Sequence, residues 1–229
     1  MTASTAVTFT PWHSPGARVP QRGNRLTRAL ARGLLRLGGW RVTGALPDLP
    51  RFVIIVAPHT SNWDFLVGVL AMYAIGLRVG FFGKDTIFRP PLGWLMRWLG
   101  GRPVDRSNPH GVVEQTIAAI RTAPRFVLAL APEGTRKRVA RWRTGFYHVA
   151  LGAGVPIVPV AFDYARREVI LGPCLWPSGD LERDLAVIRG FYRDKQGKRP
   201  ELFAMDEAGK PEGQDTSGPS NVQRPRSNV

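Results

Sequence analysis

The sequence has 229 residues and a mass of 25.3 kDa, which is enough for one domain with a sizeable core and short extensions. Its single cysteine, Cys174, excludes an internal disulfide. The formal net charge of +15 and the pI near 11.3 indicate anionic partners, namely nucleic acid, an anionic membrane surface or phosphorylated substrates, and charge alone does not choose among them.

The N-terminal part of the chain divides into two segments of different composition. Residues 1–23 are rich in Thr, Pro, Gly and Arg, and this composition predicts a disordered, basic N-terminus. The next segment, "NRLTRALARGLLRL" at residues 24–37, repeats arginine and leucine every three or four positions on two different faces. With Asn24 as N-cap and Gly38 as a stop, residues 24–38 are predicted to form an amphipathic helix. Two interpretations of its leucine face stay open, packing on the core or contact with an anionic bilayer.

Alternating strands and helices follow this helix. Short apolar runs predict four strands, at residues 52–57, 79–83, 126–130 and 155–162. Helical patterns between them predict helices at residues 64–75, 91–99, 111–122 and 142–151. Such alternation is typical of α/β proteins, so residues 39–194 are predicted to form a single domain with a mostly parallel central sheet flanked by helices. The polar sequence of residues 195–229, which contains Pro and Gly, predicts a disordered tail.

No segment of the sequence is predicted to span a membrane. The apolar stretch 65–77 is too short, and the longer stretch 144–162 is interrupted by two prolines and a histidine. The first twenty residues lack the apolar core of a secretory signal, although seven arginines and no acid in the first 47 residues also fit a mitochondrial transit peptide. A protein without a spanning helix is therefore expected.

Polar residues cluster where predicted strands end, which is where ligands gather in an open α/β sheet. The strand at 52–57 is followed by "PHTSNWD", which contains His59 and Asp64. Five residues along one continuous helix would place these two side chains roughly 140° apart, so they can meet only if His59 lies in the loop and Asp64 in the first helical turn. A neutral imidazole could then accept a proton from a hydroxyl while the carboxylate fixes its tautomer and stabilises the imidazolium.

Other interpretations of these residues stay open. The spacing from Ser61 to Asp64 is also that of a helix capping box, and His59 could merely close a strand. A metal site at His59 and Asp64 is not predicted, because no further ligands cluster with them. No Gly-x-Ser-x-Gly nucleophile motif is present. The alternative bases are His110, in a turn, and His148, in an apolar run where a core histidine is expected.

The segment "APEGTRKR" at residues 131–138 follows a predicted strand and carries groups suited to a phosphorylated substrate. Gly134 allows a tight turn, and Thr135 offers a hydroxyl. Arg136 offers a guanidinium that can bind phosphate through two hydrogen bonds. Glu133 needs an arginine or a substrate hydroxyl as its partner, and the alternative is a surface turn with an acid–base pair.

The segment "GGRPVDR" at residues 100–106 places Arg102 and Arg106 around Asp105. This arrangement predicts either a salt-bridged strand or a second contact to phosphate. A further basic patch surrounds Trp142, but no helix-turn-helix, zinc-finger or RRM motif accompanies it, so nucleic acid is not the expected partner.

Together, four segments of the chain resemble the motifs of the glycerolipid acyltransferases of the lysophosphatidate acyltransferase type. The family's His-x-x-x-x-Asp motif is "HTSNWD" here, its second block, which ends in arginine, is "GGRPVDR", its third is "PEGTR", and its fourth, a proline-containing apolar strand, is "VPIVPV". The four occur in the family's order across roughly residues 59–160, so together they are far more specific than any one of them.

The resemblance implies an O-acyltransferase of phospholipid biosynthesis that moves a fatty acyl group from a thioester, acyl-CoA or acyl carrier protein, to a hydroxyl of a lysophospholipid. The implied acceptor is 1-acyl-glycerol-3-phosphate and the product phosphatidate. No metal and no tightly bound cofactor are implied. The expected partners are the two substrates and an anionic membrane surface, with the protein held peripherally at the cytoplasmic side of a membrane. The rival hypothesis is a non-catalytic basic module that binds anionic membrane or nucleic acid.

The resemblance also assigns roles to individual residues. It implies that His59 is the general base and that Asp64 is its partner. The predicted substrate-binding residues, which would hold the phosphate and the hydroxyl of the acceptor, are Arg106, Glu133, Gly134, Thr135 and Arg136.

Overall fold

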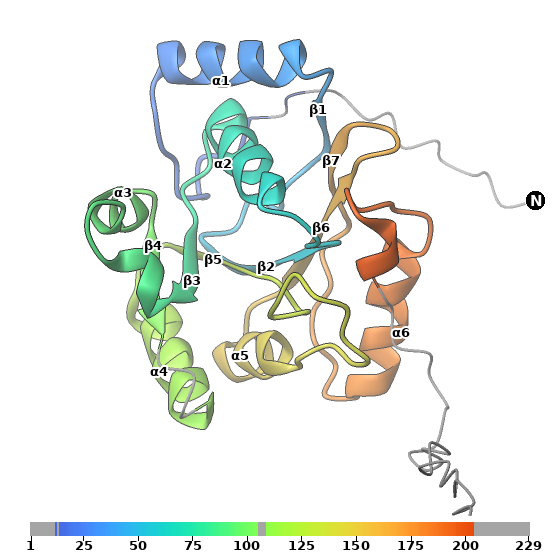
Figure 1. Ribbon diagram of the computed structural model, residues 1–229. Helices are drawn as coiled ribbons and strands as arrows, with labels where there is room; N and C mark the ends of the chain where they lie inside the picture. The colour runs from blue at the N-terminus through green and yellow to red at the C-terminus, as the bar shows by residue number, and fades with distance from the viewer. Residues whose placement is uncertain (1–11, 13, 105–108, 204–229) are drawn as a thin grey trace, which may run out of the picture.

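The computed structural model describes residues 12, 14–104 and 109–203 of the chain (Figure 1). In this part, seven strands form one sheet in the order β1-β7-β6-β2-β5-β3-β4. β7 runs antiparallel to β6, and the other neighbouring strands are parallel. The prediction of a single α/β domain with a mostly parallel sheet is therefore confirmed. The strands are β1 (Arg41–Gly44), β2 (Arg51–Ala57), β3 (Gly80–Lys84), β4 (Gly101–Val104), β5 (Phe126–Leu130), β6 (Ile157–Asp163) and β7 (Glu168–Leu171).

Helices cover both faces of this sheet (Figure 1). One face packs against α1 and α2, and the other against α4, α5 and α6, while α3 builds a small cluster of its own beside β3 and β4. The helices are α1 (Arg25–Leu37), α2 (Trp63–Ile75), α3 (Gly93–Trp98), α4 (Pro109–Thr122), α5 (Gly145–Ala153) and α6 (Leu181–Tyr192), with short 3₁₀ helices η1 (Asp85–Phe88) and η2 (Pro200–Leu202).

The central strand β2 shows why the sequence folds into these layers. Its residues "RFVIIVA" form an apolar run because both faces of a central parallel strand are buried. Since successive side chains point to opposite faces, Phe52 and Ile54 join the core under α1 and α2, whereas Val53 and Ile55 join the core under α5 and α6. The strand therefore links the two cores and holds its carboxyl end rigidly.

Among the helices and strands of the described residues, β1, β7 and α6 were not predicted from the sequence, and β4 was predicted only as one of two interpretations of residues 100–106. The three strands have four residues each, too few for a recognisable run. Helix α6 packs through Tyr192, which is fully buried. Its hydroxyl donates a hydrogen bond to the Ile55 carbonyl at 2.8 Å and accepts one from the Val160 N–H at 3.1 Å. This side chain fixes α6 to the two central strands.

Both predicted disordered ends contain segments that pack on the domain. Val19 is fully buried, and the Arg22 N–H donates to the Gly76 carbonyl at 2.9 Å, so the predicted disorder of residues 1–23 does not hold for this part. Residues 195–203 also pack, because a Cβ on Gly197 would lie only 2.8 Å from Thr60 Oγ1, a separation that glycine alone permits. The packed chain therefore extends beyond 194, and residues 1–11, 13 and 204–229 of the two predicted ends lie outside the described residues.

Helix α1 buries a different face from the leucine face that the sequence emphasises. Ala31 and Leu35 pack into the core with α2. Two of its arginines also turn inward: Arg32 Nε donates to the Ala74 carbonyl at 2.7 Å, and the Arg28 guanidinium lies beside Gly76, so both cations approach the C-terminal end of α2. The exposed side chains of α1 are the four leucines Leu26, Leu30, Leu34 and Leu37, together with Arg25, Ala29 and Arg36.

Among the described residues, no helix is long and apolar enough to cross a membrane.

Candidate functional site

Three turns meet at the carboxyl edge of the sheet. Strand β2 lies between β5 and β6, with Ile55 opposite Leu130 on one side and Ala57 opposite Ala161 on the other. Because the three strands are parallel, the residues that follow each of them emerge at the same edge. The turn after β2 carries His59, the turn after β5 carries Glu133, and the turn after β6 carries Tyr164.

The structure brings His59 and Asp64 together. His59 lies in the loop after β2, and Asp64 lies in the first turn of α2, as their spacing predicts. His59 Nδ1 is 3.4 Å from Asp64 Oδ2, slightly longer than an ordinary hydrogen bond. The Asp64 side chain is fully buried, whereas the imidazole is partly exposed, so its Nε2 edge remains the accessible one.

The predicted capping box from Ser61 to Asp64 is only half present, because the N-cap of α2 is Asn62, whose side chain makes no capping hydrogen bond. Asp64 Oδ2 accepts a hydrogen bond from the Ser61 N–H at 2.7 Å, which is the acid half of a capping box. Ser61 Oγ accepts a hydrogen bond from the Trp63 N–H at 3.2 Å. The contacts that begin α2 therefore also hold the carboxylate next to the imidazole, so the two interpretations are complementary.

Glu133 lies behind His59, within hydrogen-bond distance of its backbone. Its Oε1 accepts the His59 N–H at 2.9 Å, and its Oε2, although buried, has no hydrogen-bond partner among the described residues. The side chain is only 2% exposed. Burial raises the pKa of Glu133 from 4.5 to about 7, because the hydrogen bond from His59 only partly offsets the loss of solvent. Glu133 therefore fixes the backbone of the catalytic candidate and does not itself face the cavity.

The turn after Glu133 depends on a glycine. Gly134 has a φ of 64° and its N–H donates to the Ala131 carbonyl at 3.0 Å, a turn that the missing Cβ makes possible. A Cβ at this position would lie 2.8 Å from the side chain of Arg143, which packs across the turn. Thr135 Oγ1 accepts a hydrogen bond from the Lys137 N–H at 3.3 Å. The turn thus presents Thr135 and Arg136 on the same side as His59.

A cavity of about 1090 Å³ opens in front of His59. Its apolar lining comes from β3, α4, β5 and α5 and is called the apolar wall below: Phe82, Val112, Val113, Leu130, Phe146 and Val149. Its cationic lining, called the cationic wall below, consists of Arg136, Lys137, Arg143 and Arg199. A ligand that fills the cavity would meet a base, several cations and a long apolar surface at once.

The remaining predicted site residues lie as follows. Gly134, Thr135 and Arg136 line the cavity, whereas Arg106 lies outside the described residues. His148, expected in the core, is exposed on α5, because the buried face of that helix is taken by Phe146 and Val149. His110 is part of α4, but its side chain does not belong to the part of the chain that the structure describes.

Sequence reasoning did not identify three residues of the site. Arg143 precedes α5, Arg199 follows α6, and Tyr164 follows β6, where its hydroxyl donates to Asp64 Oδ1 at 2.6 Å. For Arg143, the basic patch around Trp142 was a usable signal. For Arg199 and Tyr164 no local signal exists, because long-range packing brings them to the site.

Comparison with known proteins assigns the chain to a family. The family model described as Acyltransferase matches residues 43–163, which is more than half of the chain and includes every predicted site residue. The chain belongs to the acyltransferase family. The match begins in β1 and ends at the last residue of β6, so it stops immediately before Tyr164.

Several relatives of this acyltransferase family member are 1-acyl-sn-glycerol-3-phosphate acyltransferases. The enzyme of Escherichia coli is 29% identical over 124 residues, which are 52% of this chain and 49% of that protein. The enzyme of Haemophilus influenzae is 29% identical over 174 residues, 70% of each chain. The chain thus spans about half the length of the first of these relatives.

A solved structure shares the fold. The 1-acyl-sn-glycerophosphate acyltransferase PlsC from Thermotoga maritima superposes with a TM-score of 0.52 at 16% identity, covering 74% of this chain and 78% of that one. This likeness supports the arrangement of sheet and helices.

Glu133 gives a prediction for the pH dependence of stability. Its pKa in the folded protein is raised to about 7 from a value of 4.5. Such a group contributes stability that is fully present below its unfolded pKa and is lost as the pH rises through its folded pKa. We therefore expect the wild-type melting temperature to fall relative to that of Glu133→Gln by a few degrees between about pH 5 and about pH 8. Thermal melts of both proteins across this range check it, and a difference that does not change with pH would contradict a raised pKa.

Proposed function

We propose that this chain is an O-acyltransferase that moves a fatty acyl group from a thioester to a free hydroxyl of a lysophospholipid. The acceptor is 1-acyl-glycerol-3-phosphate, and the product is phosphatidate. One observation carries the proposal: the His59–Asp64 pair lies at a cavity with one apolar and one cationic wall. A lysophospholipid offers the three matching groups, a hydroxyl, an anionic phosphate and an acyl chain. The names of the relatives support the same substrate class.

His59 acts as the general base in this reaction. Its Nε2 takes the proton of the acceptor hydroxyl while the oxygen attacks the thioester carbonyl carbon. The carbon–sulfur bond then breaks, and the thiolate leaves with the proton that the imidazolium returns. Asp64, 3.4 Å from Nδ1, holds the tautomer with a free Nε2 and stabilises the imidazolium. Transfer is direct, since no nucleophilic side chain takes part.

The cationic wall positions the acceptor. Arg136 and Arg143 present guanidinium groups that can bind a phosphate through two hydrogen bonds each, and Thr135 adds a hydroxyl. Fixing the phosphate places the acceptor hydroxyl within reach of His59, and such positioning can supply a large part of the rate. The apolar wall takes an acyl chain. Arg106, in the second block of the family resemblance, is a further phosphate ligand in this proposal.

The direct test is an activity assay of the purified protein. It is incubated with a panel of lysophospholipids, phosphorylated and not, and with either acyl-CoA or acyl carrier protein thioesters. Mass spectrometry of the products identifies donor and acceptor together. Formation of phosphatidate from 1-acyl-glycerol-3-phosphate is expected, and absence of product with every pair would overturn the proposal.

Removal of the base should abolish turnover without unfolding the protein. We expect His59→Ala to lower kcat by about 10²–10⁴-fold, since no other described group reaches the same position. Asp64→Asn should also lose activity, because an amide cannot stabilise an imidazolium. His148→Ala, at an exposed histidine of α5, is the matched control and should retain activity. If His59→Ala transfers acyl groups at a near-normal rate, the protein instead matches the rival hypothesis of a non-catalytic binder.

Replacing the guanidinium of Arg136 should weaken binding of the phosphorylated acceptor and leave binding of the thioester donor unchanged. Arg136→Lys keeps the charge but not the paired hydrogen bonds. We expect a higher KM for the phosphorylated acceptor and little change in KM for the thioester donor. Arg121→Lys is the control, because Arg121 is exposed at the end of α4, next to the start of β5 and thus at the opposite edge of the sheet. An equal rise in both KM values would argue against a phosphate contact at Arg136.

The same proposal needs a route to a lipid substrate, and α1 offers it. Its exposed leucines lie beside the exposed cations Arg25 and Arg36, which is the composition of a helix that lies in a bilayer interface. Each arginine near an anionic surface contributes about 1 kcal/mol to the binding free energy. The leucines, which would enter the apolar part of the bilayer, add to this binding. Because Arg28 and Arg32 contact α2 instead, the leucines carry more of this attachment than the sequence pattern suggests.

Charges on the leucine face should release the protein from membranes. Leu30 and Leu34 are 62% and 46% exposed, so Leu30→Glu with Leu34→Glu is expected to fold normally and to lose flotation with anionic vesicles. Higher salt should also weaken flotation of the wild type, since attraction is screened within about 10 Å at 0.1 M. The control pair is Leu151→Glu with Val187→Glu, at exposed positions of α5 and α6. Undiminished flotation of a stably folded Leu30/Leu34 variant would contradict membrane attachment through α1.

A further inference from the structure

Asp64 divides its two carboxylate oxygens between two sets of partners. Oδ2 accepts the Ser61 N–H at 2.7 Å and faces His59 Nδ1 at 3.4 Å. Oδ1 accepts the Tyr164 hydroxyl at 2.6 Å. The Asp64 side chain is fully buried, so water does not substitute for these contacts. Without the Tyr164 hydroxyl, Oδ1 would be a buried carboxylate oxygen without a hydrogen-bond partner among the described residues, which is a costly arrangement.

Tyr164 is itself held in place from several sides. Its ring packs edge-to-face against Trp40, with the ring centroids 4.8 Å apart. Its N–H donates to the Gln196 carbonyl at 2.8 Å. The ring and the backbone of Tyr164 are thus anchored by segments far apart in the sequence, one between α1 and β1 and the other after α6.

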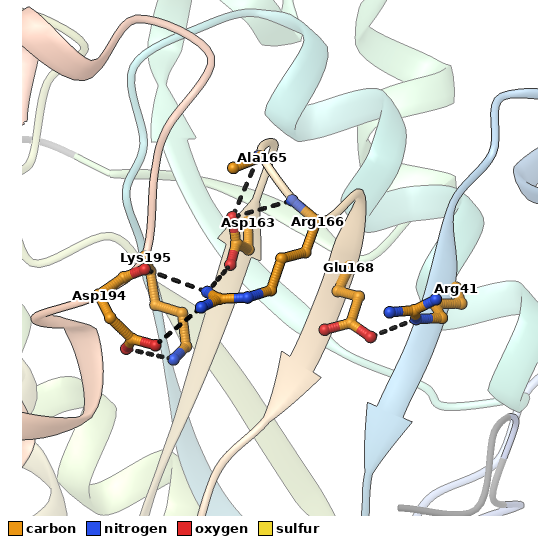
Figure 2. A network of polar contacts seen from close by, with 7 residues as sticks. All are labelled: Arg41, Asp163, Ala165, Arg166, Glu168, Asp194 and Lys195. Carbon is orange, nitrogen blue, oxygen red and sulfur yellow. Dashed lines mark hydrogen bonds and ion pairs between the residues drawn. The ribbon is translucent and has the colours of Figure 1, made fainter.

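The turn that carries Tyr164 is braced by a network of charges. Figure 2 shows the buried Asp163 carboxylate beside the backbone of Ala165 and Arg166, from which Oδ1 accepts hydrogen bonds at 3.1 and 3.3 Å. Arg166 pairs with Asp163 at 2.6 Å and reaches Asp194 at 3.4 Å. On the neighbouring strands, Arg41 pairs with Glu168. Such bracing gives the Tyr164 hydroxyl a fixed position relative to Asp64.

We infer that Tyr164 is a positioning residue of the catalytic pair, which orients the Asp64 carboxylate so that Oδ2 faces His59 Nδ1. The inference rests on the proposed role of His59 and Asp64 and extends it beyond the region that matches the family. A carboxylate bonded through one oxygen only can rotate about its χ2 torsion, whereas bonds to both oxygens fix its plane. A fixed carboxylate selects the Nδ1–H tautomer of His59, which leaves Nε2 free to accept a proton.

The protonation behaviour of Tyr164 is consistent with this role. Burial raises the pKa of Tyr164, and the hydrogen bond to Asp64 raises it further, because loss of the proton would place two negative charges side by side. The hydroxyl therefore keeps its proton at neutral pH and remains a donor to the carboxylate.

Tyr164→Phe removes the hydroxyl and keeps the ring that packs on Trp40. We expect kcat to fall about 10- to 100-fold, with the KM values of both substrates nearly unchanged. The acidic limb of the pH–rate profile should move to higher pH, because a carboxylate that no longer accepts the tyrosine hydrogen bond carries more of its negative charge toward the protonated imidazole of His59 and stabilises it more strongly. The control is Tyr73→Phe, on α2, whose hydroxyl has no hydrogen-bond partner among the described residues. An unchanged kcat and pH profile would overturn the inference.

A double-mutant cycle separates positioning from a general loss of stability. If Tyr164 acts through the Asp64 carboxylate, adding Tyr164→Phe to Asp64→Asn should change kcat by less than about twofold. A loss that stays the same in both backgrounds would mean that the hydroxyl supports the fold and not the catalytic pair. Melting curves of all four proteins accompany the cycle, and any destabilised variant is assayed below its transition.

A measurement without substrate distinguishes failure of this inference from failure of the proposed function. The ¹⁵N chemical shifts of the His59 ring, assigned by comparison with His59→Ala, report the tautomer in the resting protein. The Nδ1–H form should dominate in the wild type and in Tyr73→Phe and should decline in Tyr164→Phe. If the tautomer shifts but the wild type transfers no acyl group, positioning stands and the proposed reaction fails. If the wild type is active and the tautomer does not shift, the inference about Tyr164 is wrong.

Discussion

The arrangement of the site depends on one histidine held between two buried carboxylates. Glu133 accepts the backbone N–H of His59, and Asp64 faces its ring. Burying two acids beside each other is costly unless their environments differ. Here they do: both oxygens of Asp64 accept hydrogen bonds, from Ser61 and Tyr164, whereas one oxygen of Glu133 has no partner among the described residues and burial raises its pKa to about 7.

This arrangement requires the strand order of the sheet. His59 can contact both Glu133 and the Asp64–Tyr164 pair because β2 lies between β5 and β6 and runs parallel to both. The buried apolar runs of these three strands were recognisable in the sequence, so the centre of the fold could be predicted. The short strands β1 and β7 could not, and β4 was only one of two interpretations of its segment, since four residues carry too little periodicity and their pairing is decided by neighbours distant in the chain.

The same distinction separates the predictable from the unpredictable residues of the site. His59 and Asp64 are five positions apart, and a loop followed by a helical turn is enough to bring them together. Gly134 and Arg136 are likewise set by a local turn. Tyr164, 100 positions from Asp64, and Arg199, far from the turn after β5, reach the site only through strand register and the packing of α6. No local pattern in the sequence indicates that residues so far apart in the chain lie next to each other in the fold.

Residues outside the family match at 43–163 therefore contribute side chains and contacts to the site. After β6 the chain supplies Tyr164, then α6, and then the segment in which the Arg199 N–H donates to Thr60 Oγ1 at 3.1 Å, one position from His59. Trp40, which follows α1, packs against the Tyr164 ring. The histidine turn is thus bounded by segments from both ends of the domain. A rigid base beside an open, partly apolar cavity is the arrangement needed when the substrate is flexible, because only the protein side of the reaction can then be held in advance.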